Sequence, residues 1–294
     1  MRWTRTENLI AGYGSAAEAA AGALRESGRE ALIPAARILR LITDAEGILG
    51  AVGWDEAAGD FAGFAAEHIL LADPDADLVF TDRCGIATAY GAGASMADLE
   101  RVLPDETGAF RTLGGLITDA EGRTDVPGLW AAGASAAGIP HTGEASVASA
   151  LRCARSMVAA GHRGADREDP ERAAETLLGL GDADIAAALD ALEAEIDKAA
   201  PAPWDLRALQ TVCEAQHHLN ELPPAPPAQV LRRLLIENRL IAVRLHLTCS
   251  LERRHTAEGF PGGLPVRGGE EAYRVRTAMR DGMFYVEKEA LSFR

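Results

Sequence analysis

Aromatic residues are scarce in this chain of 294 residues, at 5% of the sequence, although 48% of its residues are hydrophobic. A buried core must therefore be built from alanine and aliphatic side chains, which suits closely packed helices and helix-covered strands. Charged residues make up only 25% of the sequence, so the composition is that of a globular protein and excludes a disordered chain.

Cysteines are few and widely spaced. The four are Cys84, Cys153, Cys213 and Cys249, with no CxxC pair among them. This spacing excludes a ribbon-type zinc site or an iron–sulfur cluster held by this chain alone. The sequence also lacks the apolar block of a signal peptide and any apolar run long enough to span a membrane. We expect a soluble, cytoplasmic protein with reduced thiols.

Basic residues are outnumbered, because 29 Lys and Arg stand against 44 Asp and Glu, for a formal net charge of −15. Such a charge repels phosphate backbones and anionic lipid, so neither nucleic acid nor a membrane surface is an expected partner. The run Arg253-Arg254-His255 is a local exception. It suits the binding of a small anion, and a solvated helix end is the alternative explanation.

Periodicity and composition divide the chain into an α/β part and a helical part. The first part is predicted to hold helices at 15–27, 84–99 and 145–160, and strands at 8–11, 30–34, 36–43, 48–54, 61–67, 68–72, 116–124 and 129–133. The second is predicted to hold helices at 171–179, 182–199, 204–221 and 229–254, and then a hairpin of 273–276 with 283–286. The expected domains are therefore 1–162, 163–256 and an extension at 257–294.

The segment Gly12-Tyr13-Gly14-Ser15-Ala16-Ala17 is a GxGxxA pattern between a short strand and a helix. A dinucleotide pyrophosphate meets helix N–H groups at such a turn. The next strand runs into Pro34 and Ala35, however, and lacks the acidic residue that would hold a ribose. A plain strand-to-helix turn explains the pattern as well.

Three other patterns suggest ligands. The run 73–77 has alternate aspartates like a calcium loop, but Leu78 and Cys84 stand where glycine and glutamate are required, so an acidic surface turn is favoured. Cys213 and His217 share a helix face and could ligate a metal, although without a second pair we favour packing. His141 lies in a loop before a helix, where its imidazole suits an anionic substrate or a structural role equally.

Several segments carry a family resemblance by their order along the chain. They are 38–55, 89–94, 114–124, 126–133, 237–240, 251–254 and 283–290, of which Val126-Pro127-Gly128-Leu129-Trp130-Ala131-Ala132-Gly133 is the most specific. Together they resemble the flavoprotein subunits of the fumarate reductase and succinate dehydrogenase superfamily, and most of all the alpha subunit of adenylylsulfate reductase. The likeness covers most of the chain and implies a partial FAD-binding Rossmann-like domain with an antiparallel hairpin, followed by an α-helical domain.

The resemblance also implies a function. It suggests an FAD-dependent oxidoreductase subunit acting on a small anionic substrate, with a flavoprotein or iron–sulfur subunit as partner. Gly133, Ala134 and Ser135, together with Gly12 and Gly14, would contact FAD. His141 and Arg254 would be the catalytic residues that orient the substrate.

The sequence departs from the family at several points. We expect the family's N-terminal phosphate-binding βαβ unit to be missing, with Gly12 to Ala17 matching the entrance of a later helix and a partner chain supplying the unit. Asp73 and Pro74 replace glycines, Ala134 replaces an acid, Phe110 replaces a histidine, and the capping domain is reduced to about 99–114. These departures support an alternative, which is a non-catalytic homologue that acts as a binding or scaffold subunit.

Overall fold

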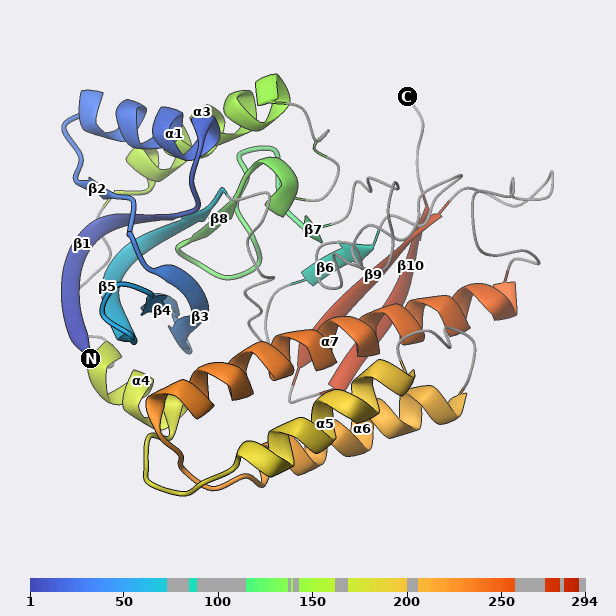
Figure 1. Ribbon diagram of the computed structural model, residues 1–294. Coiled ribbons are helices and arrows are strands. Elements are labelled where there is room, and N and C mark those ends of the chain that lie inside the picture. The colour runs from blue at the N-terminus through green and yellow to red at the C-terminus, as the bar shows by residue number, and fades with distance from the viewer. Residues whose placement is uncertain are drawn as a thin grey trace. The chain divides into compact units, whose positions relative to one another are not determined.

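The computed structural model describes residues 1–72, 85–88, 115–136, 139, 143–161, 169–199, 206–256, 273–280 and 283–290 (Figure 1). Its contacts divide the chain into two compact units. The first contains 1–86, 113–178 and 278–282, and the second contains 87–112, 179–277 and 283–294. The predicted fold class, an α/β part followed by helices, is confirmed.

Parallel strands form the centre of the first unit. They are β1 (Arg2–Ala11), β2 (Ala31–Leu32), β5 (Asp60–Leu71) and β8 (Leu129–Ala131), in the spatial order β2-β1-β5-β8. The sequence predicts two strands where β5 is one continuous strand of 12 residues. Its length lets β5 pair with β1 along one edge and with an antiparallel neighbour along the other.

The predicted antiparallel hairpin is confirmed. It consists of β3 (Arg37–Asp44) and β4 (Gly47–Asp55), and β4 pairs in turn with β5. The Asp44 carboxylate accepts a hydrogen bond of 2.8 Å from the backbone N–H of Glu46, which fixes the tight turn between the two strands.

The first strands and helix form a parallel βαβ unit. β1 leads through the GxGxxA turn into α1 (Ser15–Glu26), and the chain returns to β2, where Asn8 and Leu9 pair with Ala31 and Leu32. The expectation that such a unit is missing and comes from a partner is therefore wrong. Its three elements are predicted at 8–11, 15–27 and 30–34, but β1 is predicted too short, because its first half is mostly polar and largely exposed.

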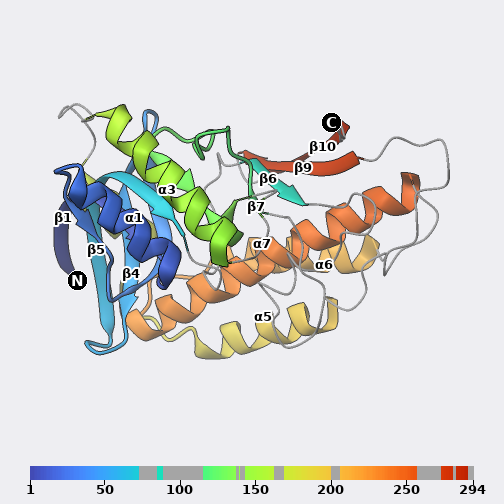
Figure 2. The same ribbon diagram turned by 90° about the horizontal axis from the view of Figure 1, so that it is seen from above.

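Two helices with small side chains lie side by side on the parallel strands, α1 and α3 (Gly143–Ala160), as Figures 1 and 2 show. Alanines let the two backbones approach closely, which explains how a core with few aromatic residues is filled. Their shared core includes Ala16, Ala17, Ala20, Ala21 and Leu24 of α1, Ala150, Cys153, Ala154 and Met157 of α3, and Ile10, Leu70 and Trp130 of the sheet.

A short helix completes the first unit. α4 (Pro170–Leu178) contacts β3, β4 and β5 and buries Ala174 and Leu178. The sequence predicts this helix at nearly the same residues.

The second unit contains three helices that pack on one another, α5 (Ala186–Ala199), α6 (Leu206–Asn220) and α7 (Pro227–Thr256). All three were predicted. Two arginines of α7 fix its register against α5, since Arg232 reaches Asp190 at 2.6 Å and Arg239 reaches Asp197 at 2.5 Å. No helix within the described ranges combines the length and apolarity needed to cross a bilayer.

A second sheet has the order β10-β9-β6-β7. Its strands are β6 (Gly85–Thr88), β7 (Gly115–Leu116), β9 (Tyr273–Arg280) and β10 (Met283–Ala290). The predicted C-terminal strand pair is thus confirmed. The predicted helix over 84–99 is wrong at β6, where sheet pairing overrides the local preference, and the rest of that range lies outside the described residues.

The pairing of β1 with β5 requires a residue without a side chain at position 63, which is Gly63. This glycine lies opposite Trp3, and a Cβ atom added to it would come within 2.5 Å of the Trp3 ring. We predict that Gly63→Val lowers the free energy of unfolding by about 1–3 kcal/mol, because overpacking forces the strands apart. Urea unfolding of Gly63→Val, Trp3→Ala and the double variant measures the coupling. Equal costs of Gly63→Val with and without Trp3 would contradict this origin.

Candidate functional site

The carboxyl ends of three parallel strands meet at one edge of the sheet. β1, β5 and β8 end at Ala11, Leu71 and Ala131, and short hydrogen bonds of 2.9 Å continue the alignment beyond them, from Ala72 N–H to Ala11 and from Ala132 N–H to Leu71. Open α/β sheets bind ligands at this edge. We call it the carboxyl edge.

The carboxyl edge brings together predicted site residues that are far apart in the sequence. Gly12 and Gly14 follow β1 directly, and Gly133 follows β8 by two residues. Because β5 lies between β1 and β8, the two glycine turns are separated by the width of one strand.

The turn between β1 and α1 is open in front of the helix. Gly12 and Gly14 have φ angles of 147° and 83°, which favour glycine. Gly14 is the N-cap residue and has no capping side chain, and no heavy atom of the described residues lies within 4 Å of the position of a Gly14 Cβ atom. The first N–H groups of α1 therefore lie at a positively polarised helix end that no described side chain caps.

The glycine at position 133 is required for a different reason, which is its close contact with α3. Its φ is 57°, and an added Cβ atom would lie 3.0 Å from the hydroxyl of Ser146 on α3. The Gly133 N–H donates to the Ser149 hydroxyl at 2.9 Å, and that hydroxyl donates to the carbonyl of Ser146 at 2.8 Å. The sequence interpretation missed both serines, whose only signal is their place in the small-residue run of α3.

The two residues after Gly133 continue a single 3-10 turn, Gly133–Ser135. Ser135 is buried, and its N–H donates to the Ala132 carbonyl at 3.2 Å. The side chain of Ala134 lies outside the described part of the chain. The roles of these three residues toward a cofactor stay predictions.

The end of β2 carries no carboxylate. This strand ends at Leu32, and the following residues 33–36 are Ile, Pro, Ala and Ala. The residues described at the carboxyl edge therefore fit the pyrophosphate of a dinucleotide at α1, and those that follow β2 lack the acidic partner of a ribose hydroxyl.

The two predicted catalytic residues are not brought to this edge by any described contact. His141 lies outside the described residues, as do Asp73, Pro74, Phe110 and 99–114. Arg254 lies on α7, and its side chain is not among those described. The orienting roles of His141 and Arg254 stay predictions.

The candidate metal ligands on α6 have structural partners. His217 lies 3.2 Å from the Glu221 carboxylate, one turn away, and both side chains are exposed. Within the described ranges, no three metal-binding side chains gather at one place. The exposed His217 is a residue of the helix surface, and the interpretation of Cys213 as a packing residue stays a prediction.

The same fold occurs in solved structures of oxidoreductase subunits. A variant of the Escherichia coli quinol fumarate reductase FrdA matches with a TM-score of 0.59 at 10% identity, over 87% of this chain and 71% of that one. Mycobacterium smegmatis Sdh1 in complex with UQ1 matches with a TM-score of 0.58 at 13% identity, over 94% of this chain and 71% of that one.

Adenylylsulfate reductase from the hyperthermophile Archaeoglobus fulgidus matches with a TM-score of 0.56 at 13% identity, over 94% of this chain and 75% of that one. No protein-family model and no curated protein sequence matches the chain. The predicted resemblance is thus confirmed at the level of the fold.

Cys153 holds α3 against β8 behind the carboxyl edge. Its thiol donates to the Ala131 carbonyl at 3.4 Å and is almost fully buried. Burial raises the pKa of this thiol to about 12. A thiol that stays protonated is a poor nucleophile, so Cys153 is structural.

The shifted pKa of Cys153 predicts a pH dependence of stability. In the unfolded chain the thiol ionises near pH 9, whereas the folded chain keeps its proton up to about pH 12. The contribution of this thiol to the free energy of unfolding is therefore fully present below about pH 9 and is lost between about pH 9 and 12, because the unfolded state loses the thiol proton first. Urea unfolding at rising pH should show a smaller loss in Cys153→Ala. An unchanged loss in Cys153→Ala, as in the control Cys213→Ala, would contradict the assignment.

Proposed function

We propose that the chain is an FAD-binding subunit of an oxidoreductase. One observation carries this proposal, which is the uncapped α1 N-terminus behind the glycine turn of a parallel βαβ unit, with open space at Gly14. Helix N–H groups and the helix dipole stabilise a pyrophosphate at such a position. The other parallel strands end at the same edge, where a bound dinucleotide would continue along the sheet.

The comparisons support the reaction class. A quinol fumarate reductase and an adenylylsulfate reductase share the fold, and both fumarate and adenylylsulfate are anions. Bound FAD would supply the transfer of electrons. We propose that His141 and Arg254 orient a small anionic substrate, and that Gly133 lies beside the cofactor with its loop held by Ser149.

The test compares two glycines that lie just outside α1. Gly14 and Gly28 have φ angles of 83° and 75°, and within the described part of the chain no heavy atom lies within 4 Å of either Cβ position. They flank opposite ends of the helix. We predict that Gly14→Ala weakens FAD binding about tenfold or more, because the methyl group enters the pyrophosphate position, whereas Gly28→Ala binds FAD like the wild type.

Calorimetric titration with FAD and the visible spectrum of the washed complex measure this binding. Gly28→Ala should lower the free energy of unfolding by about 1–2 kcal/mol. Gly14→Ala should lower it by at least as much, because φ and ψ angles of 83° and −170° lie in a region that essentially only glycine occupies. Urea unfolding of both variants gives the folded fraction at which FAD affinity is compared, which separates strain from lost binding. Equal FAD affinity of the two variants would show that the turn does not hold the cofactor. A folded wild type that binds no FAD would contradict the proposed function itself.

A second candidate function is a non-catalytic binding or scaffold subunit. The absence of a carboxylate after β2 favours this function. The Gly133 N–H favours it too, because it already donates to the Ser149 hydroxyl and is not left for a cofactor. In that case, we propose, the chain docks on a flavoprotein or iron–sulfur subunit. A folded, colourless protein that co-purifies with such a subunit would support this function over the first.

Ala134 offers a way to test the flavin end of the proposed site. We predict that Ala134→Glu raises FAD affinity, because a carboxylate after Gly133 can accept hydrogen bonds from the ribityl chain. Ala134→Met is the control, since it adds similar length without an acceptor. The affinities come from FAD titration of both variants. No gain in Ala134→Glu over Ala134→Met would show that Gly133 does not lie beside the flavin.

A further inference from the structure

The first unit has a second polar region at the opposite end of α3. This helix starts beside Gly133, where Ser146 and Ser149 contact the glycine, and it runs against the direction of β8. Near its other end Ser156 meets Trp130, and the carbonyl of Gly161 lies 2.8 Å from the imidazole of His68. The region therefore lies away from the carboxyl edge.

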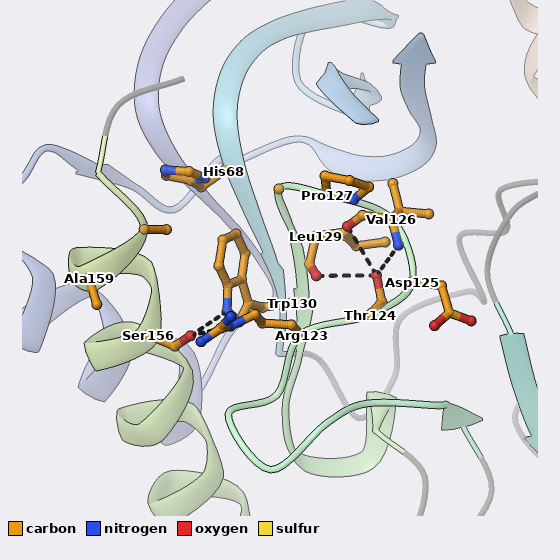
Figure 3. Close-up of a pocket in the computed structure, with 12 residues that line it drawn as sticks. His68, Arg123, Thr124, Asp125, Val126, Pro127, Leu129, Trp130, Ser156 and Ala159 are labelled. Atoms are coloured by element: carbon orange, nitrogen blue, oxygen red, sulfur yellow. Dashed lines mark hydrogen bonds between the residues drawn. The ribbon is translucent and has the colours of Figure 1, made fainter. Parts of the chain in front are cut away.

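A cavity of about 360 Å³ opens in this region (Figure 3). It is lined by the end of α3, by His68 of β5, and by the loop and first residues that lead into β8. Its volume lies at the lower end of the range typical of small-molecule sites. The proposed function does not use it.

The loop at this cavity is held in place by hydrogen bonds. The Pro127 and Gly128 carbonyls accept N–H groups of β4 and β5, at 2.9 and 2.8 Å. The Thr124 hydroxyl accepts the Val126 N–H at 3.1 Å, and the Thr124 N–H donates to Leu129 at 3.0 Å. The wall is therefore preformed, so a ligand would not have to order it.

One cation is fixed at the cavity. The Arg123 Nε–H and the Trp130 indole N–H both donate to the Ser156 hydroxyl, each at 3.1 Å (Figure 3). The nearest carboxylate, on Asp119, lies 3.8 Å from Nε. No acceptor among the described residues bonds the two Nη groups of Arg123, whose side chain is 54% exposed.

We propose that this cavity binds a small monocarboxylate with an apolar body. The Nη pair of Arg123 matches a carboxylate in a two-point hydrogen bond. The exposed residues Pro127, Ala159 and Ala160 supply apolar contact for the rest of the ligand. Asp125 also lines the cavity, and its charge disfavours a second anionic group on the ligand.

Benzoate is a suitable probe, with benzylamine and benzyl alcohol as charged and neutral controls. The reporter is the indole N–H of Trp130 in a ¹H–¹⁵N NMR spectrum, which is assigned among the four tryptophans by Trp130→Phe. Its hydrogen bond to Ser156 makes the signal sensitive to any change at Arg123. We expect benzoate to shift it saturably with a Kd of about 1 mM, and the two controls not to shift it.

Two variants test the geometry. Arg123→Gln should weaken benzoate binding about tenfold, whereas Arg172→Gln, an exposed arginine on α4, should leave it unchanged and controls for net charge. Ala159→Phe fills the cavity from an exposed helix position, keeps Arg123, and should abolish the shift. No saturable shift, equal shifts with benzylamine, or full binding in either cavity variant would overturn the proposal. FAD binding does not enter any of these outcomes.

Discussion

The close contact between α1 and α3 is the constraint on which the first unit depends. Alanines 16, 17, 20 and 21 of α1 lie in one buried cluster with Ala150 and Ala154 of α3. Because these side chains are small, the two helices pack closely against each other on β1, β5 and β8. This closeness fixes both helices relative to the strand ends. The first N–H groups of α1 thus lie directly after Gly14 at the end of β1, and Ser146 and Ser149 of α3 contact Gly133 after β8. A larger side chain in this contact would move both turns of the carboxyl edge together.

The same contact separates two regions with different electrostatics. Helix N-termini carry partial positive charge and helix C-termini partial negative charge. The beginning of α1 thus favours an anion at the carboxyl edge through backbone N–H groups alone. At the far end of α3, the polarity is reversed, and a fixed guanidinium, Arg123, supplies the positive charge instead. Two anion-compatible positions in a strongly acidic chain therefore arise by different physical means.

Much of this fold is predictable because its elements have clear periodicity. The hairpin of β3 and β4 and the helices α3 to α7 follow from apolar spacing and turn residues. The three elements of the βαβ unit follow too, but β1 is predicted too short, because residues 2–7 are mostly polar and their strand geometry comes from pairing with β5. The strand β6 is predicted as part of a helix for a similar reason, because its strand geometry comes from pairing within the second sheet. At the candidate site, the glycines of the turn are visible in the sequence, whereas Ser149 acts through a contact across 16 residues that only the fold creates.

The two glycine turns show why a motif alone does not assign a cofactor. Gly14 and Gly133 both have positive φ angles and both end a strand of the same sheet. At Gly133, Ser146 occupies the space that a side chain would need. At Gly14, no described residue occupies that space. A glycine that is explained by packing would be required with or without a ligand. The case for FAD therefore depends on Gly14 more than on the more family-like segment around Gly133, and the βαβ unit that contains Gly14 is the part the sequence was expected to lack.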